Sequence, residues 1–313
     1  MTERIDVEFT ADGDVTLRGW LYLPDAKGPR PAITMAHGYG GNREMGLDRY
    51  ARRFADAGFV VLVHDHRSFG ASDGEPRNDV DPWRQIADWR RAISFLEARP
   101  EVDADRIGVW GTSFAGGHAM VLGATEVRVK CVVSQVPTIS GFEQWQRKVP
   151  PERIAAFELA HADDERAQAA GGEPRYQTSI GDDPADPALF SSPDALRFYR
   201  DLVPAGHWNN TVTMRSNRAS RMYEPGAWIA RVAPKPLMMI VETGETVVPA
   251  DIQLAAFERA LSPKELVLLP GGHFDAYNVH FDESSGAALS WFRTHLDPAA
   301  TATATASATA TGS

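Results

Sequence analysis

The stretch "VWGTSFAGGHAM", residues 109–120, decides the fold of this chain. An apolar run leads into Gly111 and Ser113, and the small residues after the serine open a segment with helical character. A serine on a sharp strand-to-helix turn needs small neighbours because the chain doubles back there, and its hydroxyl then lies at the positive end of the helix. The pattern therefore predicts a reactive serine at position 113, although Ala115 stands where the usual pattern has glycine.

Strand-like and helix-like segments alternate on both sides of this turn. The β-branched and apolar runs expected to form strands are 4–10 and 15–24, as an opening hairpin, then 31–38, 59–67, 105–113, 129–137, 235–243 and 264–272. The amphipathic segments expected to form helices are 43–58, 81–99, 114–125, 249–261 and 285–296. This alternation predicts an α/β fold with a mostly parallel eight-stranded sheet flanked by helices.

Residues 138–232 interrupt the alternation with charged helical pieces, a polar Gly/Asp/Pro loop and many aromatic side chains. We expect a core of residues 1–137 and 233–296, with 138–232 as a helical cap inserted over the carboxyl ends of the strands, where open α/β sheets bind ligands. Residues 297–313 are almost entirely Ala and Thr and are expected to be disordered.

Four aromatic residues of this expected cap are candidates for substrate binding, namely Trp145, Tyr199, Trp208 and Tyr223. They favour a bulky or aromatic ligand. The alternative for each is that it only attaches the cap to the body, because aromatic side chains are mostly found in cores.

A second motif, "MAHGYGG" at 35–41, directly follows an expected strand. Such a turn can present backbone N–H groups toward a nearby nucleophile, as an oxyanion hole requires. The Tyr39 and Phe114 N–H groups are the expected donors, and His37 is interpreted as a hydrogen-bonding residue of the turn rather than a base.

A third motif, "LLPGGHFDAY" at 268–277, places His273 in a Gly-rich loop after the last expected strand. A general base on a loop held by rigid strands is what a serine nucleophile needs. Three carboxylates could orient this histidine: Glu242, Glu245 and Asp251. Glu245 is favoured because it lies in the loop beyond a strand and follows the order nucleophile, acid, histidine.

These motifs in this order resemble the α/β-hydrolase superfamily over residues 5–296. "HDHRSFGASDGEPR" at 64–77, "TVVP" at 246–249 and "LPGGHFDAY" resemble its dienelactone-hydrolase-like and Xaa-Pro-dipeptidyl-peptidase-like branch, which includes hydrolases related to fungal polyketide transferases. Members of this branch usually carry Asp where Glu245 stands. The resemblance also implies architectural roles, tying adjacent loops together, for the charged and polar residues Asp65, Arg67, Ser72 and Asp73.

The expected activity is hydrolysis of a small-molecule ester or lactone through an acyl-enzyme on Ser113. Acyl transfer, or hydrolysis of an amide or carbamate, would use the same residues. A non-catalytic ligand-binding protein of the same fold is the alternative from another class.

Composition limits the partners. The formal charge of −10 argues against nucleic acid or an anionic membrane surface as the main partner. The single cysteine, Cys131, excludes an internal disulfide, and His64 and His66 lack a third ligand at suitable spacing, so we expect no metal and no cofactor. No apolar run is long enough to cross a membrane, and the charged first residues favour a cytoplasmic protein. The oligomeric state is open, with a homodimer as one alternative.

Overall fold

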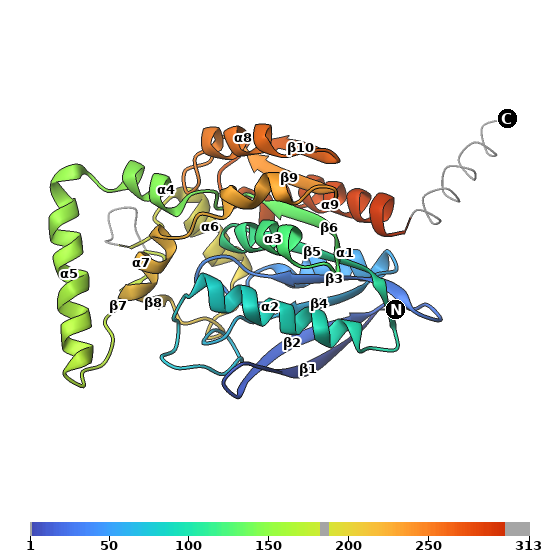
Figure 1. The fold of residues 1–313 in the computed structure, drawn as a ribbon, viewed down its shortest axis with the longest axis horizontal. Helices are drawn as coiled ribbons and strands as arrows, with labels where there is room; N and C mark the ends of the chain where they lie inside the picture. Colours follow the sequence, from blue (N-terminus) through green and yellow to red (C-terminus); the bar gives the residue numbers. More distant parts are fainter. Residues whose placement is uncertain (1, 182–187, 298–313) are drawn as a thin grey trace.

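The computed structural model describes residues 2–181 and 188–297, and within them an eight-stranded sheet flanked by helices forms the centre of an α/β fold (Figure 1). The strand order is β1-β2-β4-β3-β5-β6-β9-β10, and only the pairs β1–β2 and β2–β4 are antiparallel. The mostly parallel eight-stranded sheet expected from the sequence is therefore confirmed. The Ala/Thr tail lies outside the described residues from position 298 onward.

The strands of the sheet follow the expected segments closely. Their bounds are β1 Glu3–Ala11, β2 Val15–Leu23, β3 Arg30–Ala36, β4 Val60–His64, β5 Val102–Thr112, β6 Val129–Gln135, β9 Leu237–Glu242 and β10 Lys264–Leu269. The helices that pack on the sheet are α1 Leu47–Asp56, α2 Pro82–Glu97, α3 Phe114–Thr125, α8 Ala250–Arg259 and α9 Phe281–Leu296.

Two hydrophobic layers hold the helices to opposite faces of the sheet. Because side chains alternate along a strand, Ala32 and Ala36 of β3 face one layer and Ile33 and Met35 face the other. The first layer contains side chains of α2, α3 and α8, and the second contains those of α1 and α9. Strands buried on both faces read as continuous apolar runs, which is why β4 is recognisable in the sequence.

Residues 138–232 lie at one end of the sheet, with α5 outermost (Figure 1). Their helices and short strands are α4 Gly141–Lys148, α5 Pro151–Ala169, β7 Tyr176–Thr178, α6 Pro193–Leu202, β8 Thr211–Thr213, α7 Met214–Arg221 and the 3₁₀ helix η1 Pro225–Arg231. The sequence predicted helical pieces here but not the small antiparallel ribbon of β7 and β8. Three-residue strands are too short to show an alternating pattern.

The loop after β4 ties neighbouring segments together through polar side chains. The Asp65 carboxylate accepts hydrogen bonds from the Arg43 and Ala71 N–H groups at 2.8 and 3.0 Å. Arg67 forms an ion pair of 2.5 Å with the buried Asp88 of α2. These contacts, with those of Ser72 and Asp73 to Arg18 of β2, agree with the architectural role implied by the resemblance.

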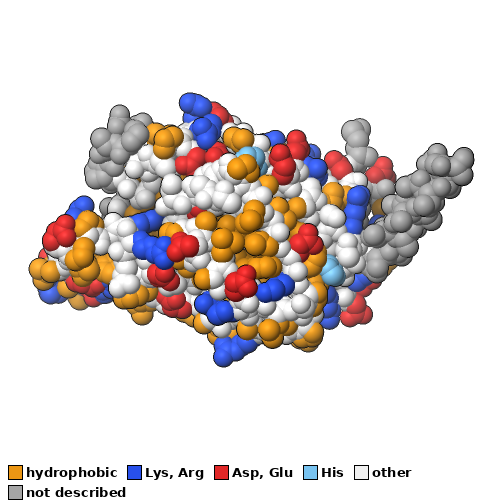
Figure 2. All heavy atoms as spheres, turned by 90° about the horizontal axis from the view of Figure 1, so that it is seen from above, with side chains coloured by type: hydrophobic (Ala, Val, Ile, Leu, Met, Phe, Trp, Pro, Cys, Tyr) orange, Lys and Arg blue, Asp and Glu red, His pale blue; other side chains and the backbone are white. Residues whose placement is uncertain are grey.

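The face seen from above carries an apolar area near its middle, between charged side chains (Figure 2). In the edge strand β10 and the turn before it, Leu268 and Leu261 are 51% and 58% exposed. A homodimer remains a prediction from the sequence.

Among residues 2–181 and 188–297, no helix combines the length and apolar character needed to cross a bilayer.

Besides His273, four buried histidines lie near the carboxyl ends of the strands, namely His37, His64, His66 and His118. Burial disfavours their charged form, lowering the pKa of His37 to about 4 and that of His66 to about 3. The pKa values of His64 and His118 are also lowered by burial.

Mild acid should therefore destabilise the fold. Because these pKa values are lower in the folded than in the unfolded chain, the unfolded state binds more protons as the pH falls below 6.5 toward 4, and stability present at pH 7 is lost. We expect a loss of about 2 kcal/mol each for His37 and His66 between pH 7 and pH 5. Urea unfolding at both pH values measures this loss, and equal midpoints would contradict it.

Candidate active site

Ser113 lies at the turn between β5 and α3 with a backbone φ of +57° and ψ of −120°. A Cβ atom at Gly111 would lie 2.0 Å from the Ala115 carbonyl oxygen, so the position tolerates only glycine. The Ala115 methyl group, which departs from the usual pattern, is buried in the core without preventing the turn. The turn directs the Ser113 side chain toward the loops beyond the strands.

His273 lies between Ser113 and Glu245. Its Nε2 atom is 2.8 Å from the Ser113 Oγ atom, and its Nδ1 atom is 2.6 Å from Glu245 Oε2. The other oxygen of Glu245 accepts hydrogen bonds from the Val247 and Val248 N–H groups at 2.7 and 3.0 Å. The histidine side chain is 3% exposed and that of the glutamate 0%. This geometry allows His273 to take a proton from Ser113 while Glu245 holds the imidazole.

The other two carboxylates considered from the sequence contact different partners. Glu242, at the end of β9, is 3.0 Å from Nδ1 of His280, and burial raises its pKa. Asp251, on the surface, pairs with Arg147 at 2.8 Å. Of the three, Glu245 is the one that contacts His273.

The turn at 37–41 packs directly against Ser113. A Cβ atom at Gly38 would lie 2.7 Å from the Ser113 Cβ atom, so glycine is required for this approach. Within the described residues, neither the Tyr39 N–H group nor the Phe114 N–H group has a hydrogen-bond partner. Two free donors beside a serine hydroxyl are suited to stabilise an oxyanion.

His37 supports this turn rather than facing the serine. Its Nε2 atom is 3.1 Å from the Met45 carbonyl oxygen, its Nδ1 atom accepts the Gly38 N–H at 2.8 Å, and its ring stacks on Tyr277. Both ring nitrogens are therefore occupied by backbone groups.

A cavity of about 660 Å³ opens beside Ser113 between the sheet and residues 138–232. Its apolar wall includes Trp145 of α4, Phe157 of α5 and Phe190. Tyr39, Phe114 and Val247 contribute to its wall from the core. The cavity can therefore hold a molecule with sizeable apolar or aromatic parts next to the serine.

Of the four aromatic residues considered for substrate binding, only Trp145 lines this cavity. Tyr199 and Trp208 pack on each other, with ring centroids 5.2 Å apart, and the Trp208 indole N–H donates to the Gly40 carbonyl oxygen. Tyr223 is fully buried, and its hydroxyl is 2.8 Å from His118 Nδ1. Trp208 and Tyr223 thus attach the inserted segment to the body, while Tyr199 packs on Trp208 within that segment. The structure places none of these three side chains in the wall of the cavity, and their contact with substrate stays a prediction.

Helix α6 holds the loop that carries His273, a role not visible in the sequence. The buried Asp194 accepts a hydrogen bond from the Phe274 N–H at 3.0 Å, and Arg197 pairs with Asp275 at 2.6 Å. A Cβ atom at Gly272 would lie 2.6 Å from an Asp194 carboxylate oxygen, so glycine permits this contact. The only hint in the sequence is the pair of glycines before His273.

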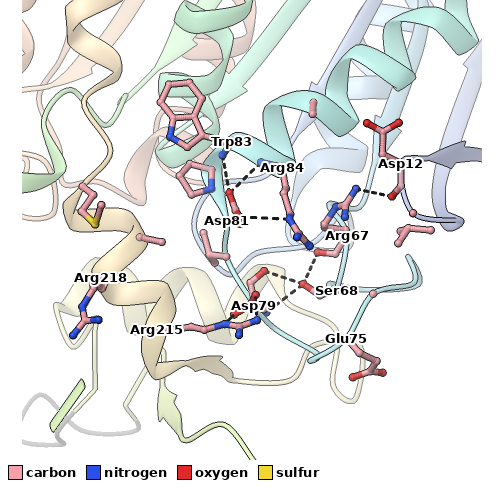
Figure 3. Close-up of a pocket in the computed structure, with 18 residues that line it drawn as sticks. Asp12, Arg67, Ser68, Glu75, Asp79, Asp81, Trp83, Arg84, Arg215 and Arg218 are labelled. Carbon is pink, nitrogen blue, oxygen red and sulfur yellow. Dashed lines mark hydrogen bonds and ion pairs between the residues drawn. The ribbon is translucent and has the colours of Figure 1, made fainter. Parts of the chain in front are cut away.

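A second cleft of about 910 Å³ is lined in part by Arg215 and Arg218 of α7 (Figure 3). Other residues of the same helix, Asn217, Ser220 and Arg221, line the cavity beside Ser113. Each arginine that lines it is paired with a carboxylate: Arg67 with Asp88, Arg84 with Asp81, Arg215 with Asp79 and Arg218 with Glu165. Its serine, Ser68, bonds to backbone carbonyl groups of Arg67 and Asp79. Among the described residues that line this cleft, none is a serine or cysteine with a histidine partner, in contrast to Ser113.

No group of three or more His, Cys, Asp or Glu side chains among the described residues is arranged to hold a metal ion. His64 and His66 are buried, with ring centroids 5.3 Å apart.

Comparison with known proteins agrees with this architecture. A family model described as X-Pro dipeptidyl-peptidase (S15 family) matches residues 12–275. The quorum-quenching protein AidA of Acinetobacter baumannii is 32% identical over 274 residues, which are 87% of this chain and 88% of that protein. The polyketide transferase af380 of Aspergillus fumigatus is 33% identical over 298 residues, covering 94% and 99% of the two chains. The crystal structure of the α/β hydrolase GrgF from a Penicillium species has a TM-score of 0.80 at 28% identity, covering 94% of this chain and 99% of that one.

The contact between α6 and the His273 loop predicts that Asp194→Ala slows the reaction of Ser113 with a fluorophosphonate. Loss of the carboxylate leaves the Phe274 N–H unpaired and lets His273 move away from the serine, and we expect a labelling rate about tenfold lower. Labelling followed by mass spectrometry measures it.

Arg200→Ala, on the exposed side of the same helix, is the matched control, because within the described part of the chain Arg200 pairs with its neighbour Asp201 and with no residue of the His273 loop. Equal labelling rates for Asp194→Ala and Arg200→Ala would show that α6 does not position His273.

Proposed function

Because the chain belongs to the X-Pro dipeptidyl-peptidase (S15) family, within the α/β hydrolases, we propose that it is a serine hydrolase that cleaves a carboxylic ester or lactone. The observation that carries this proposal is the hydrogen-bonded series Ser113, His273 and Glu245. The His273 Nε2 atom is 2.8 Å from Ser113 Oγ, and its Nδ1 atom is 2.6 Å from Glu245 Oε2. A buried series of nucleophile, base and acid next to a cavity is the geometry that acyl transfer to a serine requires.

In the proposed mechanism, the Ser113 Oγ atom attacks the substrate carbonyl while His273 Nε2 accepts its proton. The Tyr39 and Phe114 N–H groups stabilise the negative charge that develops on the carbonyl oxygen. Glu245 stabilises the imidazolium, and its own position is held by the Val247 and Val248 N–H groups. His273 then gives the proton to the leaving oxygen, and a water molecule activated by the same histidine releases the acid from Ser113.

The cavity favours a bulky, largely apolar substrate over a dipeptide. Trp145, Phe157 and Phe190 form an apolar wall. A peptide with a free amino terminus would bring an ammonium group, and buried charges require a partner of opposite sign. Among the described residues that line the cavity, none is Asp or Glu. Ester or lactone cleavage therefore fits the cavity better than the peptidase activity named in the family's description.

Acyl transfer is the second candidate, supported by the similarity to a polyketide transferase along 94% of this chain. The first half of the reaction is the same, and an alcohol or amine replaces water in the second half. Product analysis with and without an added alcohol distinguishes the two: a product consisting only of free acid supports hydrolysis, and ester exchange at low alcohol concentration supports transfer.

Ser113→Ala is expected to lower kcat on a hydrolysed aryl ester by a factor of about 1,000 or more, because the covalent route is lost while the fold is kept. Glu245→Gln is expected to lower kcat by a smaller factor, since His273 and Ser113 remain in place. A panel of esters, lactones, amides and carbamates assayed with both variants tests the proposal. Near wild-type turnover by Ser113→Ala would overturn it.

A further inference from the structure

Among residues 2–181 and 188–297, the charged residues that line the cavity beside Ser113 all have one sign. They are Lys148 at the end of α4, Arg153 at the start of α5, and Arg221 at the end of α7. The whole chain has 42 acidic and 32 basic residues, so an exclusively basic set is the opposite of what its composition favours. Local positive charge in a concave site raises the concentration of anions there.

Structural roles explain one of these cations. Arg221 contacts the Glu158 carboxylate and lies 4.6 Å above the Trp145 ring, so it helps to hold α7 against α5. Within the described residues, Lys148 and Arg153 have no carboxylate partner, and the Lys148 Nζ atom lies 5.8 Å from the centre of the Phe190 ring.

Helix stability does not explain Arg153 either. A cation in the first turn of a helix lies at the positive end of the helix dipole, which is unfavourable. Lys148 is in the last turn of α4, where a cation is favourable, but Arg147 beside it already supplies that charge and pairs with Glu143 and Asp251. Lys148 and Arg153 are both exposed to solvent where they line the cavity, so a ligand that enters it can reach them. Desolvation lowers the pKa of Lys148 and the charge of Glu245 raises it, and an anion bound beside the lysine would likewise favour its charged form.

We propose that the acyl part of the substrate carries an anionic group, such as a carboxylate, that binds Lys148 and Arg153 while its carbonyl lies at Ser113. This inference rests on the proposed function. The acyl part is the portion that stays in the cavity after the leaving group departs. Its apolar middle packs against Trp145, Phe157 and Phe190, and its charged end pairs with the two exposed cations.

Matched pairs of p-nitrophenyl esters test this proposal. In each pair, a straight acyl chain ends in either a carboxylate or a neutral carboxamide, and the chain length is increased through the series. We expect the wild-type kcat/KM to favour the carboxylate about tenfold at the best chain length, because charge-assisted hydrogen bonds are stronger than neutral ones. Added salt should reduce this preference by screening the charges.

Lys148→Met combined with Arg153→Gln is expected to bring the ratio of the two kcat/KM values close to one. Arg147→Gln is the matched control, since it removes the same charge from α4 at a residue that does not line the cavity, and it should keep the wild-type ratio. Lys148→Glu should shift the preference toward a chain ending in an ammonium group, a gain that a poorly folded variant could not show.

A ratio near one for the wild type at every chain length, or an unchanged ratio in the double variant, would overturn the anionic substrate class. Continued hydrolysis of the carboxamide esters and fluorophosphonate labelling of Ser113 would leave the proposed function intact in that case. Absence of both hydrolysis and labelling would instead overturn the proposed function itself.

Discussion

The arrangement of the site depends on one steric constraint, the sharp turn at Ser113. The serine has a positive φ, and β5 and α3 meet there so closely that a side chain at Gly111 would collide with the backbone of the next helix. The turn at 37–41 then packs against the serine, because Gly38 leaves no side chain between them. A residue in this strained backbone region is retained when the surrounding structure holds it in place. Here the sheet, α3 and the neighbouring turn hold the serine in this conformation. Together they place the Tyr39 and Phe114 N–H groups beside the Ser113 hydroxyl.

His273 completes the site because it is held from two sides. Glu245 reaches its ring from the loop after β9, and Asp194 of α6 binds the backbone next to it. The base therefore depends on a segment inserted between β6 and β9 as well as on the core. The same segment supplies the aromatic wall and the cations of the cavity, so Asp194 and most of the residues proposed to contact the substrate belong to one piece of the chain.

The sequence predicted the features that follow from local backbone requirements. The small residues around Ser113, the glycines of the 37–41 turn and the loop before His273 each demand a particular local geometry, and Glu245 followed from its order in the chain. The wall of the cavity could not be predicted in this way. Tyr199 and Trp208 are as aromatic as Trp145, yet they stack on each other, and only the packing of short helices decides which ring faces the cavity. Asp194 likewise carries no motif, because its role depends on a contact with Phe274, 80 residues along the chain.

The central claim, that Ser113 forms a covalent acyl-enzyme, is tested most directly by rapid-quench mass spectrometry of the intact protein during turnover of an activated ester. The account predicts a burst of leaving group equal to the enzyme concentration, together with an acyl group on the peptide that contains Ser113. The ester is used in excess and is chosen for slow release of its acid, so that deacylation limits turnover and the acyl-enzyme accumulates. An acyl group on another residue, or turnover of that ester with no acylated protein, would contradict the account.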